Sequence, residues 1–490
     1  MKRLSTILMI IGLLCFAGLV FAEEQAATTP PAAEQVVPAQ PATPAPLKID
    51  TGDTAWMIMA TALVMLMTIP GLALFYGGLS KRKDTLNTIA MSFATFCIVS
   101  VLWVIYGYTF AFGTDISGII GSPAKLLLAG VGVNSIADAA KTIPEYIFIV
   151  YQLTFAAITV ALASGAYIER MKFSAWLIFS MLWMTFAYLP VAHWVWGGGF
   201  LAKLGALDFA GGTVVHINAG IAALVGALIL GKRREMTLIP NNLTLVVTGA
   251  GLLWFGWFGF NAGSALGANA LAVSAFATTN VSGAAGGLSW MFFDVVRGKK
   301  PSVLGFCIGA VVGLAAVTPG AGFVGIPQSI FIGFVAAIIS NLAVYWKTKT
   351  TLDDTLDVFP CHGVGGIVGL LLTGLLATKT VNPAGSDGWF YGNHEFFFTQ
   401  LKLVAITVSY SFIVSYGIFK FINLLQPMRV SSEEEEEGLD STQHNEKYTQ
   451  GTLLVSSHGF IYEKEVEDEM EEDMENVRQI VTEHTKLKSS

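Results

Sequence analysis

Two histidines lie inside long apolar stretches of this sequence, where a polar side chain finds few partners. His216 stands near the start of the stretch at 214–230, and His362 stands near the start of the stretch at 361–378. An ionisable residue in such a segment costs free energy and is therefore a candidate for function. A neutral imidazole donates one hydrogen bond, accepts one, and exchanges a proton near neutral pH. A facing pair can line a path and pass a proton, whereas a simple helix-to-helix hydrogen bond is the alternative for each residue alone.

Aromatic side chains cluster near the ends of several apolar stretches, where they can contact a cation. Trp196 follows the stretch at 173–195, and Phe155 lies in the first turns of the stretch at 146–168. A desolvated cation over a ring face gains about 2 kcal/mol, so these rings could form a cation-binding vestibule. The aromatic belt that membrane proteins carry at the lipid interface is the alternative.

Four aspartates stand where a helix is about to begin. Asp208 precedes the stretch at 214–230 at N-cap distance, and a carboxylate there accepts the free N–H groups of the following helix. We therefore expect a structural role for Asp208 rather than direct cation binding. Asp353, Asp354 and Asp357 are expected to cap a helix and clamp a loop, because no other hard ligand accompanies them. No metal site, cofactor motif or nucleophile–base pair is recognisable, so an enzyme is disfavoured.

The elements that carry these residues are long apolar segments. Of the whole chain 53% is hydrophobic and 13% charged, against roughly 25% charged in ordinary globular domains. Each segment is long enough to cross a hydrocarbon core roughly 30 Å thick as a helix. We therefore predict an all-α polytopic membrane protein with eleven transmembrane helices, at about 57–79, 86–112, 146–168, 173–195, 214–230, 243–263, 278–296, 303–320, 328–346, 361–378 and 397–423.

Lysines and arginines gather in the loops on one side of this predicted bundle. Basic loops stay in the cytoplasm, which predicts an outside N-terminus and a cytoplasmic C-terminus in a multi-pass protein of the cell membrane. The cytoplasmic bases are Lys81, Arg82, Lys83, Arg170, Lys172, Lys232, Arg233, Arg234, Arg297, Lys299, Lys300, Lys347, Lys349, Lys420 and Arg429. The outer bases are Lys48, Lys125, Lys141, Lys203, Lys379 and Lys402.

The order of the stretches suggests an internal repeat. Pro70-Gly-Leu-Ala-Leu-Phe-Tyr-Gly-Gly78 in the first stretch is similar to Gly256-Trp-Phe-Gly-Phe-Asn-Ala-Gly263 in the sixth, and His216 matches His362. An odd number of helices per repeat inverts the second copy, as in many transporters with a site near the bilayer midplane. We therefore predict two inverted five-helix repeats plus one C-terminal helix.

Both ends of the chain are predicted to lie outside the membrane domain at 53–430. Residues 1–22 have the three regions of a secretory signal peptide, and residues 23–52 form an Ala/Pro-rich extracytoplasmic linker. Residues 431–490 form an acidic cytoplasmic tail with 17 Asp or Glu and 5 Lys or Arg. Within it, apolar residues at 466–481 recur as on an amphipathic helix. The dispersed bases do not resemble a nucleic-acid footprint.

Over about 53–440 the chain closely resembles the Amt/MEP/Rh ammonium transporter family, in its bacterial or archaeal Amt form. Pro360-Cys361 departs from the Gly-Val that many relatives have before the second histidine, and this can shift the start of the tenth helix. The matching phrases are Met67-Thr-Ile-Pro-Gly-Leu-Ala-Leu-Phe-Tyr-Gly-Gly78, Ala192-His-Trp-Val-Trp-Gly-Gly-Gly199, Gly205-Ala-Leu-Asp-Phe-Ala-Gly-Gly-Thr-Val-Val-His-Ile-Asn-Ala219, Gly256-Trp-Phe-Gly-Phe-Asn-Ala-Gly-Ser264 and Asp357-Val-Phe-Pro-Cys-His-Gly-Val-Gly365.

The resemblance implies roles for individual residues, a homotrimer with one pathway per subunit, and closure by a PII signalling protein from the cytoplasm. No cofactor is implied. The implied roles are an ammonium recruitment site of Trp196, Phe155 and Ser264, a gate of Phe155 and Phe260, pore residues His216, His362 and Trp257, a vestibule neighbour Gln152, and a structural acid Asp208.

The mechanism that follows is capture of ammonium outside, loss of a proton at the gate, and passage of ammonia along the histidines, with or without the proton. Potassium would be excluded because it has no proton to lose. Two alternatives remain open at this point. One is an ammonium sensor of the same fold. The other is a cation-coupled transporter of small organic solutes, which the absence of an intramembrane carboxylate in the sequence disfavours.

Overall fold

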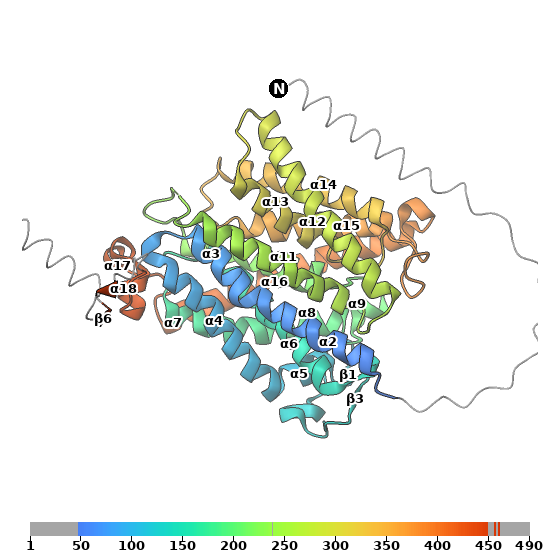
Figure 1. The fold of residues 1–490 in the computed structure, drawn as a ribbon. Helices are drawn as coiled ribbons and strands as arrows, with labels where there is room; N and C mark the ends of the chain where they lie inside the picture. The colour runs from blue at the N-terminus through green and yellow to red at the C-terminus, as the bar shows by residue number, and fades with distance from the viewer. Residues whose placement is uncertain (1–47, 238, 449–454, 457–458, 461–490) are drawn as a thin grey trace, which may run out of the picture. The chain divides into compact units, whose positions relative to one another are not determined.

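The computed structural model describes residues 48–237, 239–448, 455–456 and 459–460, and most of these residues are helical (Figure 1). The chain divides into two compact units, Met1–Glu446 and Lys447–Ser490. The described part of the second unit is a short antiparallel pair, β5 (Val455–Ser456) and β6 (Gly459–Phe460). The predicted signal peptide and the predicted amphipathic helix at 466–481 lie outside the described residues.

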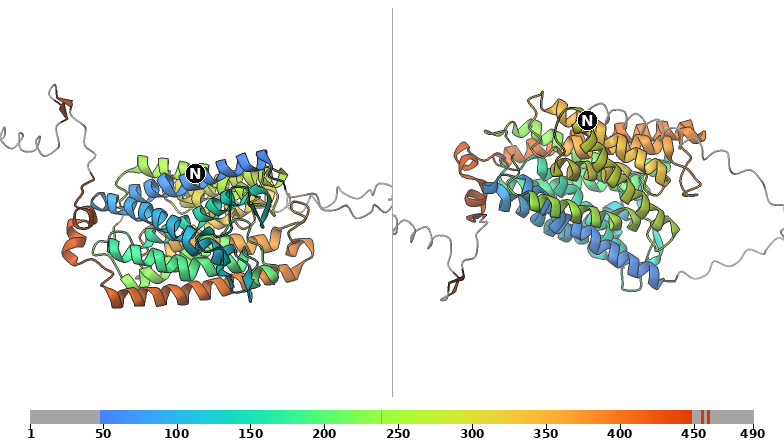
Figure 2. Two further views of the ribbon diagram at one scale, coloured as in Figure 1. Left: turned by 90° about the horizontal axis from the view of Figure 1, so that it is seen from below. Right: turned by 45° about the horizontal axis from the view of Figure 1, so that its top comes forward.

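The first unit is a bundle of helices that run side by side (Figure 1). The long helix α16 follows the flank of the bundle over the full length (Figure 2). The α-helices are α2 (Thr51–Leu66), α3 (Ala73–Leu79), α4 (Thr85–Leu102), α5 (Tyr108–Phe112), α6 (Glu145–Ala163), α7 (Phe173–Trp183), α8 (Leu189–Val195), α9 (Phe200–Lys203), α10 (Asn218–Leu230), α11 (Leu243–Gly263), α12 (Ala270–Val296), α13 (Val303–Val317), α14 (Ile326–Lys347), α15 (Gly365–Leu376), α16 (His394–Leu425), α17 (Ser432–Glu437) and α18 (Leu439–His444).

Wider, π-helical turns interrupt or begin several of these helices. Such turns are rare and frequently occur at functional sites. Three of them join α2 to α3, α4 to α5 and α7 to α8, and the other two lead into α10 and α15. They are η2 (Met67–Leu72), η4 (Trp103–Gly107), η7 (Met184–Tyr188), η8 (Gly212–Ile217) and η9 (Phe359–Val364).

Short elements fill the connections. Between α5 and α6, β1 (Asp115–Ile116) pairs with β2 (Ile120–Gly121), and β3 (Ile136–Ala137) pairs with β4 (Ala140–Pro144), both antiparallel. The 3₁₀ turns are η3 (Arg82–Asp84), η5 (Pro123–Leu128), η6 (Ser164–Ala166) and η10 (Trp389–Tyr391).

Within the described residues, nine helical segments are long and apolar enough to cross a membrane. Each coincides with one of the predicted stretches, and α12 and α13 occupy the remaining two. Helix caps account for two of the differences between the predicted and observed starts. The Asn269 side chain accepts the N–H of Ala272 and starts α12 at Ala270, eight residues before the predicted 278. Asp50 caps α2 at Thr51, so this helix includes the last two residues of the predicted linker.

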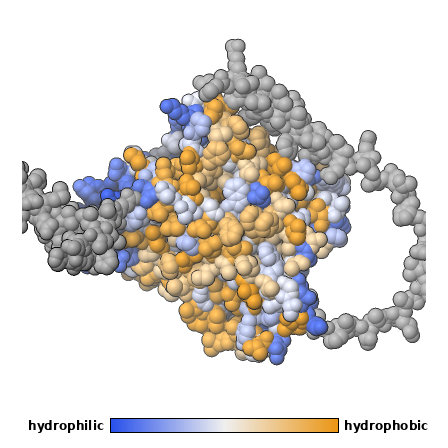
Figure 3. Space-filling model, viewed as in Figure 1, coloured by the Kyte–Doolittle hydropathy of each residue, from blue (hydrophilic) through white to orange (hydrophobic). Residues whose placement is uncertain are grey.

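The face of the bundle shown in Figure 3 is mostly apolar, and hydrophilic residues gather toward its edges. Large apolar side chains are exposed on the surface of the bundle. Val273 on α12 is 70% exposed, and Ile413 on α16 is 68% exposed. In water such an apolar surface would promote aggregation, whereas it is compatible with contact to lipid tails. The protein is therefore a multi-pass membrane protein.

Candidate functional site

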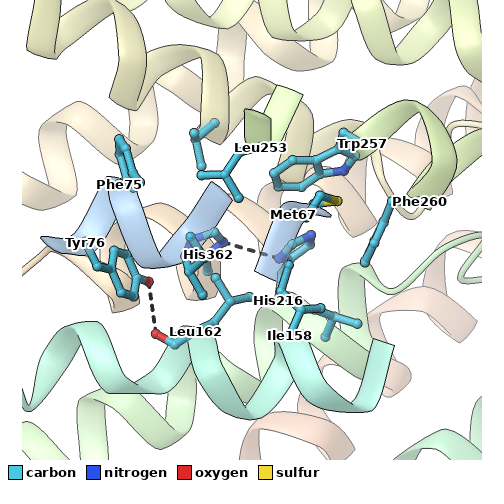
Figure 4. Close-up of a pocket in the computed structure, with 13 residues that line it drawn as sticks. Met67, Phe75, Tyr76, Ile158, Leu162, His216, Leu253, Trp257, Phe260 and His362 are labelled. Carbon is cyan, nitrogen blue, oxygen red and sulfur yellow. Dashed lines mark hydrogen bonds between the residues drawn. The ribbon is translucent and has the colours of Figure 1, made fainter. Parts of the chain in front are cut away.

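The two histidines of the apolar stretches meet inside the bundle (Figure 4). Nδ1 of His216, in η8, lies 3.3 Å from Nδ1 of His362, in η9. Their rings are nearly parallel, with centroids 5.2 Å apart and 19° between the planes. Both side chains are buried. In a neutral pair one Nδ1 donates and the other accepts, so the two imidazoles must be complementary tautomers.

Asp208 holds the start of the turn that carries His216. Its two carboxylate oxygens accept backbone N–H groups at 2.7–3.1 Å, and these groups are the free donors of a helix N-terminus. Burial raises the pKa of Asp208 above its usual value, and the hydrogen bonds oppose this shift. The carboxylate is thus fully occupied by backbone. The four donors belong to Gly211, Gly212, Thr213 and Val214.

Asp354 stands at the same spacing before His362 as Asp208 before His216. Its carboxylate accepts the N–H groups of Val358 at 3.0 Å and Phe359 at 2.7 Å, at the start of η9. Burial raises the pKa of Asp354 to about 6. Each histidine-bearing turn is therefore fixed at its N-terminal end by a buried aspartate.

The other two aspartates of this loop form ion pairs with basic side chains. Asp353 accepts from the Nε atom of Arg233 at 3.0 Å, and Asp357 pairs with Lys347 at 2.5 Å. No cluster of three or more metal-ligating side chains occurs within the described residues. The geometry is that of a loop clamp.

Aromatic rings close one end of the histidine pair. The rings of Phe155, on α6, and Phe260, on α11, are stacked with centroids 4.1 Å apart and 20° between their planes. The ring of Trp196 meets the edge of Phe155 at 5.8 Å, and its Nε1 donates to the backbone carbonyl of Asp208 at 2.7 Å. Asp208 therefore holds η8 through its carboxylate and Trp196 through its backbone carbonyl.

Ser264 caps α11 beside these rings. Its hydroxyl lies 2.9 Å from the Phe260 carbonyl, to which it donates, and 3.2 Å from the hydroxyl of Tyr151. The Tyr151 hydroxyl donates to the same Phe260 carbonyl at 2.8 Å. With its proton committed to a carbonyl, the Ser264 oxygen keeps lone-pair capacity for an N–H donor.

Trp257 lies beside His216, and Gln152 is buried on α6. The Trp257 ring lies 5.4 Å from the His216 ring at 25°, and its Nε1 donates to Thr318 Oγ1 at 2.9 Å. Gln152 is buried on α6, and its Oε1 has no hydrogen-bond partner among the described residues. Trp257 therefore contacts the histidine pair.

A small cavity surrounds the histidines. The volume that the centre of a water-sized molecule can occupy in it is about 10 Å³. This is close to the minimum for one water. Every lining residue is buried. Figure 4 shows the residues Met67, Leu72, Phe75, Tyr76, Ile158, Leu162, Val215, His216, Leu253, Trp257, Phe260, Val311 and His362.

No role was predicted for the first apolar stretch, although it supplies four of these lining residues. These residues lie in the segment 67–78. The proline and glycines of this segment were the sequence feature that distinguished it. His193 is fully buried. Its Nδ1 lies 2.9 Å from the Ala111 carbonyl, and its Nε2 lies 2.9 Å from Asp115 Oδ1, so it is a structural residue.

Residues 55–449 match the sequence profile of the Ammonium Transporter Family. An ammonium transporter of Aquifex aeolicus (strain VF5) is 54% identical over 401 residues, which cover 82% of this chain and 94% of that protein. Ammonium transporter Amt1 of Archaeoglobus fulgidus is 47% identical over 398 residues, which cover 81% and 98% of the two chains.

Solved structures have the same fold. The crystal structure of Saccharomyces cerevisiae Mep2 superposes with a TM-score of 0.75 at 35% identity, covering 84% of this chain and 94% of that chain. A sensor Amt protein superposes with a TM-score of 0.71 at 26% identity, covering 80% and 98%. The curated relatives named here are transporters, which confirms that the chain is not an enzyme. It belongs to the ammonium transporter family.

Proposed function

We propose that this protein captures ammonium at Trp196, Phe155 and Ser264, removes a proton at the Phe155–Phe260 ring pair, and conducts ammonia past His216 and His362. The observation that carries the proposal is the small cavity behind the rings, whose lining residues are all buried. Its lining is apolar except for the histidine pair, the Tyr76 hydroxyl and the Trp257 indole.

Such a cavity favours a neutral solute over an ion. A monovalent cation without its water costs several kcal/mol in an apolar interior, even after relaxation. The room around the histidines suits about one small molecule and leaves no space for a hydration shell. Ammonia fits this volume and can exchange hydrogen bonds with an imidazole, whereas potassium cannot lose a proton and remains charged.

Capture outside the rings compensates part of the hydration that ammonium loses. The Trp196 and Phe155 rings lie edge to face, and the Ser264 oxygen stands at the end of the adjoining helix. A cation over an aromatic face gains about 2 kcal/mol when desolvated, and the serine oxygen accepts an N–H hydrogen bond. Gln152 supplies a further acceptor, its Oε1, to the vestibule in this proposal.

For topology, we propose eleven spanning helices built as two inverted five-helix repeats plus α16. The matched spacing of Asp208 to His216 and of Asp354 to His362 supports the repeat, because both aspartates hold the start of a π-helical turn. The N-terminus is outside and the C-terminus cytoplasmic in the cell membrane, with a signal peptide at 1–22, a linker at 23–52, a membrane domain at 53–430 and a tail at 431–490.

For partners, we propose a homotrimer with one pathway per subunit and a PII signalling protein at the cytoplasmic face. The exposed apolar side chains of α12 can face either lipid or a second copy. On the side that carries the basic loops, the Glu435 carboxylate accepts from the Arg429 guanidinium and from the N–H of Arg234. The C-terminal segment is therefore joined to the surface that a cytoplasmic regulator would meet.

Currents on purified protein in a solid-supported membrane test the proposal. Ammonium should produce a transient current or an associated pH change, whereas potassium and alanine should produce neither. A response to alanine would favour a transporter of organic solutes. Binding of ammonium without flux would favour a sensor, and either result would overturn the proposal.

A further inference from the structure

Gln400 is a fully buried glutamine on α16 whose side-chain amide makes two hydrogen bonds with the backbone of one residue. Its Nε2 donates to the Leu207 carbonyl at 2.7 Å, and its Oε1 accepts the Leu207 N–H at 3.0 Å. Leu207 directly precedes Asp208 in the chain. We propose that Gln400 is a positioning residue for ammonium capture, which fixes the backbone before Asp208 so that the Asp208 carbonyl can hold Trp196. This inference rests on the proposed function, because it concerns the capture step.

The segment that Gln400 contacts, residues 205–211, connects α9 with η8 and has no helix or strand of its own. We call it the Asp208 loop. Backbone groups in such a loop receive no partners from a helix or a sheet, and a buried N–H or C=O group needs one. A glutamine amide carries a donor and an acceptor side by side, so it can pair with both backbone groups of one residue, as a neighbouring strand does. Gln400 supplies these partners from α16.

The next peptide group of the loop, between Asp208 and Phe209, is held from two other sides. Its N–H donates to the Pro319 carbonyl at 3.0 Å, and its carbonyl accepts from Trp196 Nε1 at 2.7 Å. Together with the two hydrogen bonds of Gln400, three successive peptide groups are fixed. Loss of the Gln400 amide would leave the first two of them without these partners, so the carbonyl that holds Trp196 could shift.

The turn that carries His216 has an anchor of its own. The Asp208 carboxylate accepts four backbone N–H groups at the start of η8, and none of these hydrogen bonds involves Gln400. Gln400 should therefore affect capture at Trp196 more strongly than passage along the histidine pair. In transport measurements, this difference appears as a change in KM with little change in the maximal current.

The stem of the Gln400 side chain lies against the backbone of α15. A Cβ atom added at Gly374 would lie 3.3 Å from both Cβ and Cγ of Gln400. This contact limits the positions that the amide can take. The surroundings contain few ionisable groups, since α15 has none, the Asp208 loop has Asp208, and Glu395 and Lys402 on α16 are exposed.

Two variants of nearly the same shape test the role of the amide. Gln400→Met keeps the length of the side chain and removes both hydrogen bonds. In Gln400→Glu, a protonated carboxyl can donate one hydrogen bond and accept the other, whereas an ionised carboxylate can only accept. A buried carboxyl holds its proton more readily than an exposed one, so at pH 5 the introduced acid should replace the amide.

The apparent KM for ammonium is measured from currents between pH 5 and pH 8 and divided by the native value at each pH. For Gln400→Met the ratio should be about ten at every pH, the size of one cation–π contact, with the maximal current retained. For Gln400→Glu it should be close to one at pH 5 and rise toward the value of Gln400→Met at pH 8.

Gln328→Glu is the matched control. Gln328 is also a buried glutamine, but it lies on α14 and its Nε2 donates to the Tyr391 hydroxyl at 3.0 Å. Its KM ratio should stay near one from pH 5 to pH 8.

A native KM in Gln400→Met would overturn the positioning role. A Gln400→Glu variant that is as impaired as Gln400→Met at pH 5 would overturn it too, because shape alone would then explain the loss. If Gln400→Met does not fold, the Gln400→Glu profile decides the question. A ratio that rises with pH, while that of Gln328→Glu stays flat, supports the role, and a ratio that does not rise overturns it.

Equilibrium binding of ammonium to the purified proteins, measured by calorimetry, separates this inference from the proposed function. Native currents together with equal binding in the native protein and Gln400→Met would leave the proposed function standing and remove only the role of Gln400. Binding that is about tenfold weaker in Gln400→Met, in a protein whose native form carries no ammonium current, would support the positioning role and refute the proposed function.

Discussion

Nδ1 of His216 and Nδ1 of His362 lie 3.3 Å apart, although 145 residues separate the two in the chain. Each ring stands on a π-helical turn whose start is held by a buried aspartate. The pair therefore acts as one hydrogen-bonded unit whose position is fixed from both helices. The consequences for capture, stability and regulation can be measured separately.

Trp196 is assigned to capture. The Trp196→Leu variant should weaken the apparent affinity for ammonium by about 1 to 2 kcal/mol, the size of one cation–π contact. Selectivity over potassium should remain, because the histidine cavity is unchanged. Concentration-dependent currents measure both quantities.

Trp194→Leu is the control for this change. Trp194 donates to the Ile119 carbonyl at 2.8 Å and contacts the ring of Tyr410, and it does not touch the stacked phenylalanines. Its replacement should leave the apparent affinity unchanged. An unchanged affinity with lost selectivity in Trp196→Leu would place the tryptophan in the filter and contradict the capture role.

The titration of Asp354 should make the free energy of unfolding depend on pH, and the raised pKa sets the sign of this dependence. Its pKa is raised from 3.8 to about 6 in the folded protein, so folding favours the protonated form. As pH rises from about 4 to about 6, the unfolded chain releases this proton first, and the free energy of unfolding falls by about 3 kcal/mol. Asp354→Asn removes this titration, so its melting temperature should rise relative to that of the native protein across this window.

Thermal unfolding of both proteins in detergent between pH 4 and pH 7 tests this sign. The Asn side chain forms weaker hydrogen bonds to Val358 and Phe359, so a constant offset between the two proteins is expected in addition. A melting-temperature difference that does not vary with pH would contradict the assignment of a raised pKa to Asp354.

The part of the C-terminal segment that ends with α18 should be required for full transport. Asp440 accepts the N–H groups of Leu86 at 3.1 Å and Asn87 at 2.8 Å, in the first turn of α4. Truncation after Leu425 removes these contacts and should lower the maximal current. Truncation after Glu446 retains them and should leave transport intact, but change inhibition by a PII protein.

Asp440→Ala separates docking from chain length in this experiment. It should resemble the truncation after Leu425, with a lower maximal current. Equal currents and equal inhibition in the native protein and all three variants would exclude a regulatory role for the segment.

The bundle and several of its site residues could be predicted because their signals are local. The lengths of the apolar stretches predicted the nine segments that qualify as membrane spans. His216 and His362 could be identified because they are polar residues at matched positions in apolar stretches. Asp208 could be expected to cap a helix from its spacing alone. Its four backbone hydrogen bonds agree with this expectation.

Other features depend on partners far away in the chain. His193 is held by the Ala111 carbonyl in α5 and by Asp115 in the following loop, and no pattern around His193 encodes these partners. Tyr76 lies within a recognisable phrase, but its hydroxyl donates to the Leu162 carbonyl near the end of α6. The π-helical turns have no distinct periodicity in the sequence, since tertiary packing decides where a helix widens by one residue.

The double variant His216→Ala with His362→Ala tests the central claim most directly, because it removes both imidazoles from the cavity. Leu253→Ala with Val311→Ala is the control that enlarges the same cavity and keeps the histidines. Currents in ammonium and in potassium are compared for both proteins. The double histidine variant should either carry no ammonium or admit potassium, while the control stays selective. Ammonium carried alone at the native rate by the double histidine variant would contradict the account.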